Sequence, residues 1–192
     1  MKESRTLFHD MIGCGIDPDG FTCQALVEGY GRDGQWTSAL NMVVELKKYG
    51  VSIPSSVYSY LIISLCRYDH PFAAMKLLDR VVEDGYEPNK DTYENLIGSL
   101  CKIECIEEPL LYKYEMLEKN IKPSLSVYLA LASCLCKFNR CHEAESLIQE
   151  MVAHGLAPDC TICNALVTGY CKAENIAKAE DILFLFAVEY HL

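Results

Sequence analysis

The sequence lacks any long hydrophobic run. None of its 192 residues belongs to a stretch approaching the roughly 18 consecutive apolar residues of a membrane span. The first fifteen residues, MKESRTLFHDMIGCG, contain acidic side chains and no apolar core of the signal-peptide type. They also differ from the Arg/Ser-rich, acid-poor transit peptides of organelles. The sequence therefore predicts neither a membrane span nor a targeting peptide within these residues.

Positive charge is scarce as well. Lys and Arg total 17 against 27 Asp and Glu, which gives a formal net charge of −10. Domains that bind nucleic acid usually carry a basic footprint, so the bulk charge argues against that function. Sustained strand alternation bounded by hairpin turns is also missing, which argues against a β-sheet. With 51% hydrophobic and 23% charged residues, the composition is that of a globular protein.

The few cations are nevertheless placed with a fixed interval. "GYGRDG", "SLCRYD", "SLCKIE", "CLCKFN" and "GYCKAE" follow one another every 35 residues. Leucine recurs at the same interval six residues before each cation, without insertion or deletion. Pro18, Pro88, Pro123 and Pro158 each come shortly after a Gly or Asn turn residue. A fixed period of this size indicates a stacked repeat array.

Each 35-residue unit contains two helical patterns. In "DTYENLIGSLCK" and again in "CHEAESLIQEMVAHG", apolar residues stand at i, i+3, i+4 and i+7, which is one face of a helix. A helical hairpin cannot bury such a face alone and stacks on its neighbours. We therefore expect an all-α fold, a right-handed α-solenoid of stacked helical hairpins with about eleven helices. Pro71 should begin a helix harmlessly, and Pro109 should shorten or bend the start of its helix.

The period divides the chain into one continuous repeat array, 1–192. Its parts are a partial repeat 1–19 that supplies a second helix, complete repeats 20–54, 55–89, 90–124 and 125–159, and a truncated repeat 160–192. Both ends fall inside a unit. We therefore expect the chain to be a piece of a longer array.

Units containing "TYENLIGSLCK", "EAESLIQEMVAHGLAPD" and "CNALVTGYCKAENIAKAEDIL" resemble the P-type pentatricopeptide repeat, a family rich in plant organelle RNA-binding proteins. The 34-residue tetratricopeptide repeat fits less well in length and landmarks. The resemblance implies a scaffold that binds single-stranded RNA in organelle RNA processing, splicing, stability or translation. It further implies a mitochondrial or chloroplast location and other organelle RNA-processing proteins as partners, without a membrane or a small-molecule substrate.

The recurring cation lies at position 13 of each unit. If the apolar face of the first helix is positions 4, 7, 8 and 11, positions 2, 5, 9 and 13 lie on the opposite face. Stacked first helices would align these cations along one surface, and the resemblance implies that they contact the RNA backbone, where a charge suffices. The alternative is a solvated cation favoured by the helix dipole. The backbone candidates are Arg32, Arg67, Lys102, Lys137 and Lys172.

The resemblance also implies that position 5 and the last residue of a unit read one base together. Ser59 with Asn89 matches a pair that the family uses for adenine, and Asn164 matches a pyrimidine-type fifth residue. Three pairs depart from the family pattern: Gln24 with Pro54, Glu94 with Ser124, and Leu129 with Asp159. The base-reading candidates are Ser59, Asn89, Asn164, Gln24, Asp159 and Asp19. These departures keep open an alternative function, a protein-binding solenoid without sequence-specific RNA binding.

The eleven cysteines suggest metal or redox chemistry, but their phase favours another interpretation. "CTIC" (160–163) has metal-ligand spacing, yet four cysteines share position 12 of their units, as small core residues would. Without a secretion signal, free buried thiols are expected rather than disulfides. No nucleophile elbow, phosphate loop or deaminase motif occurs. We expect no catalytic residues, no metal and no cofactor, and hence no enzyme.

Overall fold

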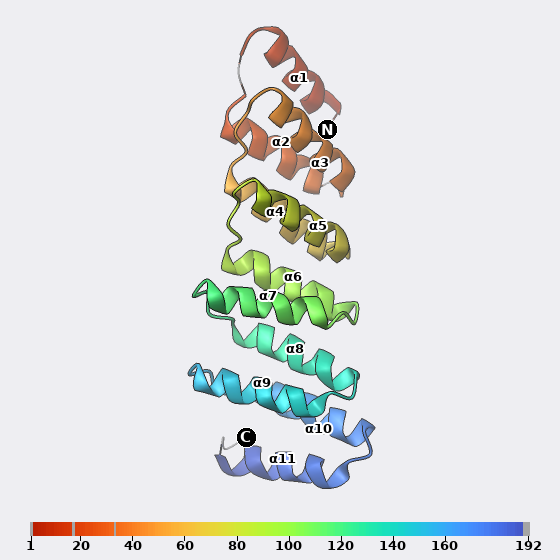
Figure 1. The fold of residues 1–192 in the computed structure, drawn as a ribbon. Coiled ribbons are helices and arrows are strands. Elements are labelled where there is room, and N and C mark those ends of the chain that lie inside the picture. Colours follow the sequence, from red (N-terminus) through yellow and green to blue (C-terminus); the bar gives the residue numbers. More distant parts are fainter. Residues whose placement is uncertain (1, 17, 33, 190–192) are drawn as a thin grey trace. The chain divides into compact units, whose positions relative to one another are not determined.

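In the computed structural model, the backbone is described for residues 2–16, 18–32 and 34–189, and the side chains of the same residues except 2–5, 7, 32 and 189. These residues form eleven helices and no strand (Figure 1). The helices are α1 (Lys2–Gly13), α2 (Gly20–Arg32), α3 (Trp36–Lys48), α4 (Ser55–Arg67), α5 (Pro71–Glu83), α6 (Lys90–Lys102), α7 (Glu107–Glu118), α8 (Leu125–Lys137), α9 (Cys141–Ala153), α10 (Cys160–Lys172) and α11 (Ile176–Glu189). The all-α fold of helical hairpins expected from the repeat is confirmed.

The helices group into two compact units, Met1–Thr92 and Tyr93–Leu192. In the first unit, α2 packs against α3 and α4, and α4 packs against α5. In the second unit, α8 packs against α9 and α10, and α10 packs against α9 and α11. Within each unit, the turns inside hairpins lie along one side and the connections between hairpins along the opposite side (Figure 1). First helices therefore neighbour first helices, as stacking requires.

Apolar burial explains why each first helix forms where it does. Positions 4, 7, 8 and 11 are buried in α4, α6 and α8, and the leucine at position 7 is at most 8% exposed in all five first helices. Their spacing places them on one stripe of each helix, which packs against the second helix and the next hairpin. The opposite stripe, at positions 2, 5, 9 and 13, is not part of this buried face.

Left-handed backbone closes the turns after first and second helices in the described part of the chain. Residues with positive φ recur at position 31, as Gly15, Gly50, Gly85, Asn120 and Gly155, and at position 15, as Gly34, Asp69, Glu104, Asn139 and Glu174. Four of the first set, all but Gly50, are the turn residues expected after second helices. The second set was not predicted, because it shares no residue type and includes Glu104 and Glu174, and positive φ is uncommon outside Gly, Asn, Asp and His. They end the first helices in a short turn that leads directly into the second.

The two prolines inside hairpins behave as predicted. Pro71 is the first residue of α5, where the missing N–H would have no helical partner. Pro109 is the third residue of α7, which begins at Glu107, one repeat position later than α3, α5, α9 and α11, and is one residue shorter than α5. Pro109 thus shortens the start of its helix.

Gly169 allows α10 to approach α8 closely. A Cβ atom built on Gly169 would lie 2.6 Å from the Cβ of Cys136 and 2.8 Å from the Sγ of Cys141. We expect Gly169→Ala to lower the free energy of unfolding by about 1–3 kcal/mol, because the helices must separate. Thermal denaturation followed by circular dichroism measures this change.

Gly98 provides the matched control for Gly169. It also lies inside a first helix, α6, but a Cβ atom there would meet nothing within 4 Å. Gly98→Ala should therefore stabilise the protein by up to about 1 kcal/mol through helix propensity alone. Equal effects of the two substitutions would show that the contact at Gly169 is unimportant.

Candidate functional site

The recurring cation is the last residue of each first helix. Arg67, Lys102, Lys137 and Lys172 end α4, α6, α8 and α10, and all four side chains are exposed. Arg32 ends α2, but its side chain lies outside the described residues. This place suits a cation for two reasons, since it faces the negative end of the helix dipole and is accessible to an anionic ligand. The assignment of these residues to phosphate stays a prediction.

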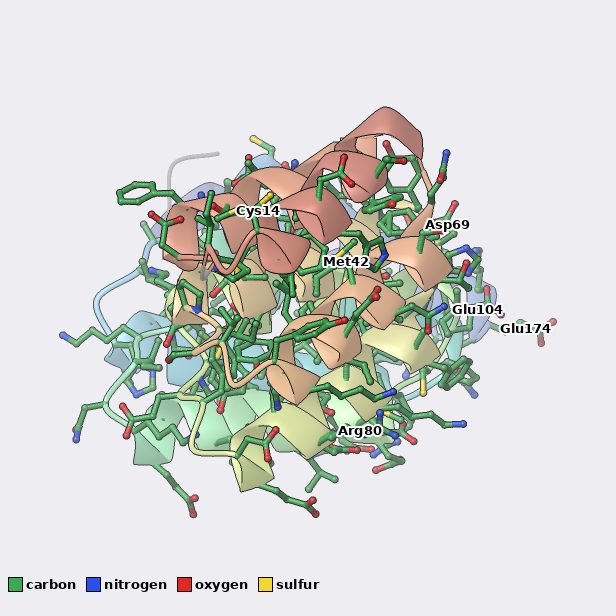
Figure 2. The ribbon with its side chains drawn as sticks, turned by 90° about the horizontal axis from the view of Figure 1, so that it is seen from above. Cys14, Met42, Asp69, Arg80, Glu104 and Glu174 are labelled. Atoms are coloured by element: carbon green, nitrogen blue, oxygen red, sulfur yellow. The ribbon has the colours of Figure 1, made fainter. Side chains whose placement is uncertain are left out.

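Acidic residues stand beside the cations. Two residues after the cation, at the left-handed position 15, the chain carries Asp69, Glu104 and Glu174, which are labelled in Figure 2. The Nζ of Lys137 lies 3.6 Å from a carboxylate oxygen of Glu104, and both side chains are about half exposed. An exposed pair of this kind is worth little and leaves the lysine available. The surface at the first-helix ends therefore mixes both signs of charge.

A hollow of about 370 Å³ lies between the first helices α8 and α10 of the second unit. Its lining includes Lys137 and Lys172, and it also includes Leu129 and Asn164, the fifth residues of their units. The structure thus brings two backbone candidates and one base-reading candidate around one depression. Thr161, at position 2, completes its rim.

Ser59 and Asn89, the best-matched base-reading pair, are connected through two further side chains. The Ser59 Oγ lies 2.8 Å from the Oη of Tyr86, and that Oη lies 3.1 Å from the Oγ1 of Thr92. The Thr92 hydroxyl in turn donates to the Oδ1 of Asn89 at 2.8 Å. The pair therefore belongs to one continuous chain of hydrogen bonds.

The last residue of a unit also caps the next helix. The Asn89 Oδ1 accepts the backbone N–H of Thr92 at 2.9 Å, and the Asp19 carboxylate accepts that of Thr22 at 2.8 Å. The Asp159 carboxylate accepts two backbone N–H groups at the start of α10. These bonds satisfy helix N-termini, which gives position 35 a structural role in addition to the predicted one.

Two of the three departing fifth residues, Gln24 and Glu94, are held by other protein groups. The Gln24 amide donates to Glu28 at 2.7 Å, and its oxygen accepts from the Ser56 hydroxyl at 3.5 Å. A Glu94 oxygen accepts the backbone N–H of Ser124 at 3.0 Å. Glu94 thus helps to cap α8, where Ser124 itself makes no side-chain cap. These contacts explain how a carboxylate is accommodated at position 5.

Sequence reasoning missed Tyr86 and Thr92. Position 32 of the other complete units is Val51, Ile121 or Leu156, so a tyrosine there is a departure from the repeat. That departure was a readable signal. Its hydrogen bonds, however, depend on how the end of one hairpin approaches two helices.

The cysteines are free thiols, as expected. Burial raises the pKa of Cys136 to about 12, and contact with the Cys141 thiol adds to this rise. Such thiols stay protonated near neutral pH and are poor metal ligands and nucleophiles. In the described part of the chain, no group of three His, Cys, Asp or Glu side chains could hold a metal ion.

Among the described residues, none of the helices has the length and apolar character needed to cross a bilayer. The candidate site lies on the first helices of the hairpins, whose surface carries hydroxyl, amide and cationic side chains.

Two family models match the chain. The model described as PPR repeat matches residues 56–86, 91–121 and 126–156, and the pentatricopeptide repeat domain matches residues 6–67 and 146–185. Pentatricopeptide repeat-containing protein At5g40400 of Arabidopsis thaliana is 49% identical over 51 residues, which are 26% of this chain and 8% of that protein. A second Arabidopsis relative, At2g27800, is named as mitochondrial and is 33% identical over 89 residues, 46% of this chain and 20% of its own length. The chain thus spans a fifth or less of these relatives.

Solved structures share the fold. Maize PPR10 superposes with a TM-score of 0.79 at 24% identity, covering 97% of this chain and 26% of PPR10. PPR10 in complex with an 18-nucleotide psaJ RNA element gives a TM-score of 0.61 at 23% identity over 94% of this chain and 27% of PPR10. The PPR domain of Arabidopsis thaliana protein-only RNase P 1 in complex with tRNA gives 0.70 at 18% identity, covering 86% of this chain and 89% of that domain.

Proposed function

The chain belongs to the pentatricopeptide repeat family, and from that premise we propose that it binds single-stranded RNA along the exposed face of its first helices. In this proposal the cations at position 13 contact phosphates, and side chains at position 5 with those at position 35 face the bases. RNA in the complexes of PPR10 and of the RNase P repeat domain supports the proposal.

The hollow between α8 and α10 is the observation that carries this proposal. Lys137 and Lys172 lie on its rim together with the amide of Asn164, so one depression offers charge for a phosphate and hydrogen-bonding groups for a base. Its apolar wall from Leu129 would contact the face of a base rather than its edge. Repeat proteins of this kind assign one base to each helical unit, which fits a hollow between consecutive first helices.

The cellular role we propose is correspondingly that of a scaffold. The chain would hold an organelle transcript for processing, splicing, stabilisation or translation, in the mitochondrion or the chloroplast. A relative named as mitochondrial favours an organelle. Other organelle RNA-processing proteins would supply the chemistry. For the chain itself we propose no enzymatic activity, no cofactor and no membrane or small-molecule partner.

Salt dependence of RNA binding tests the proposal. If each of the five cations neutralises one phosphate, the logarithm of the affinity for pooled random single-stranded RNA should fall against the logarithm of salt concentration with a slope of about −3.5. Filter binding between low and moderate salt measures this slope. Absence of binding at low salt would refute RNA binding by this chain.

A protein-binding array is the second candidate function. The net charge of −10, the carboxylates at position 15 and the engaged side chains of Gln24 and Glu94 favour it. An acidic surface repels phosphate and attracts basic protein segments. Failure to bind RNA together with saturable binding of a basic peptide would support this candidate instead.

A further inference from the structure

Tyr86 is placed to control the best-matched base-reading pair. Its side chain is 5% exposed, and its ring packs against that of Tyr58 with 5.7 Å between centroids. The Tyr86 hydroxyl lies within hydrogen-bond distance of the hydroxyls of Ser59 and Thr92. Rigid packing of the ring fixes this hydroxyl between the two.

Asn89 determines the direction of the whole chain of hydrogen bonds. The backbone N–H of Thr92 needs an acceptor, so the Asn89 amide atom that it contacts must be the oxygen, Oδ1. An amide oxygen can only accept hydrogen bonds. The Thr92 hydroxyl therefore gives its single proton to Asn89. Tyr86 must then donate to Thr92, and Ser59 must donate to Tyr86.

Both ends of the pair consequently have a defined polarity. The Ser59 proton is held by Tyr86, so the Ser59 Oγ offers only lone pairs to a ligand. The Asn89 Oδ1 is occupied twice, whereas its Nδ2 group makes no hydrogen bond to a described residue and keeps two donors. Asn89 is exposed and Ser59 half-buried, so an acceptor and a donor are presented by one unit.

We propose that Tyr86 makes this unit select adenine or cytosine, whose N6 or N4 amino group lies beside an unprotonated ring nitrogen, over guanine and uracil, which carry a carbonyl beside a ring N–H. This rests on the proposed RNA binding. Adenine and cytosine present an amino donor beside a ring-nitrogen acceptor on their Watson–Crick edge, which complements Ser59 Oγ and Asn89 Nδ2. Guanine and uracil present a carbonyl beside a ring N–H, which would place acceptor against acceptor and donor against donor. Tyr86 acts as a positioning residue, since it need not touch the base.

Two substitutions interrupt this series of hydrogen bonds, one at the Tyr86 hydroxyl itself and one at its acceptor, Thr92. Tyr86→Phe keeps the packed ring but leaves the Ser59 proton without its acceptor, so Ser59 can donate to a keto oxygen. Thr92→Val removes the group to which Tyr86 donates, so Tyr86 can turn its proton toward Ser59 and free the Ser59 proton again. Both variants should lose discrimination without losing a phosphate contact.

Selection from a random RNA pool at low salt, followed by sequencing of the bound fraction, tests the proposal. For the unsubstituted chain we expect one nucleotide position enriched in adenine and cytosine over guanine and uracil by about fivefold or more. In Tyr86→Phe and in Thr92→Val the enrichment should fall below twofold, while total RNA bound changes less than twofold. Tyr58→Phe is the control: it removes a neighbouring phenol hydroxyl that takes no part in these hydrogen bonds, and it should keep the enrichment.

The outcomes separate this inference from RNA binding itself. RNA binding with undiminished enrichment in both variants, or with no enrichment of adenine and cytosine in the unsubstituted chain, overturns the role of Tyr86 and leaves the proposed function standing. Absence of RNA binding by the unsubstituted chain overturns both. A melting temperature close to that of the unsubstituted chain shows that each variant is folded. If Tyr86→Phe does not fold, Thr92→Val alone tests the role of Tyr86.

Discussion

Replacing Glu150 by alanine is expected to lower the free energy of unfolding by about 3 kcal/mol. Glu150 on α9 accepts two hydrogen bonds from the Nζ of Lys113 on α7, at 2.9 and 2.6 Å. The Lys113 side chain is 1% exposed, so its ammonium has no access to bulk water when the carboxylate is removed. An unpaired buried charge typically destabilises a protein by about 3–5 kcal/mol.

Two features place the effect at the lower end of that range. The Glu150 side chain is 31% exposed, so water can enter the space it leaves and solvate part of the charge. The Lys113 Nζ also lies 4.4 Å from the centroid of the Tyr114 ring, a contact that survives the substitution. Urea denaturation followed by circular dichroism measures the change. If the two units unfold separately, the transition to compare is that of the second unit, which contains Lys113 and Glu150.

Lys113→Met is the control for this prediction. Met keeps the length of the buried stem and removes the charge, so it should change the unfolding free energy by no more than about 1 kcal/mol. The double variant should be closer to Lys113→Met than to Glu150→Ala, because the penalty arises from the unpaired ammonium. A loss below 1 kcal/mol in Glu150→Ala would show that Lys113 finds other solvation.

The repeat made the fold readable from sequence. A helix inferred from one apolar stripe is uncertain, but here the same stripe recurs in five successive units, with Leu61 and Leu96 as two of its members. Helix ends were equally readable, because glycine or asparagine marks the left-handed turn after the second helices α1, α3, α5, α7 and α9. Periodicity supplied several independent observations of one local structure.

The features that could not be predicted from the sequence arise where single residues depart from the repeat. Lys113 stands where other units bury Val43, Leu78 or Ile148, and Tyr86 stands where they carry an aliphatic residue. Each departure was visible in the sequence, yet its meaning was not. The partner of Lys113 lies 37 residues away on a neighbouring second helix, and that pairing follows from how hairpins stack.

The candidate site was predictable in placement and less so in chemistry. Stacking placed Lys137, Lys172 and Asn164 around one hollow, in agreement with the inferred helix faces. Helix capping by Asp19 and Asp159 was not foreseen, because a carboxylate at the end of a unit was assigned to base reading alone. One side chain can satisfy a helix N-terminus and still offer a further atom to a ligand.

Replacing both Lys102 and Lys137 by glutamine is expected to weaken binding to every single-stranded RNA about 25-fold at 0.1 M salt. Each phosphate contact to single-stranded RNA contributes about 0.7 to the salt slope, which corresponds to about fivefold in affinity between 1 M and 0.1 M salt. Both lysines end first helices of the second unit and are exposed, so their removal leaves the buried stripes intact. The slope itself should fall from about −3.5 to about −2.1.

Lys48→Gln with Lys76→Gln is the matched control, because it removes the same charge from exposed positions on the second helices α3 and α5. That variant should bind with nearly the slope of the unsubstituted chain, since a shared change in net charge acts weakly beyond the Debye length of about 8–10 Å. Filter binding at four salt concentrations, with RNAs of different sequence, measures both variants. If the two double variants weaken binding equally, net charge rather than the cations at position 13 governs RNA binding, and the first-helix surface is not the RNA-binding face.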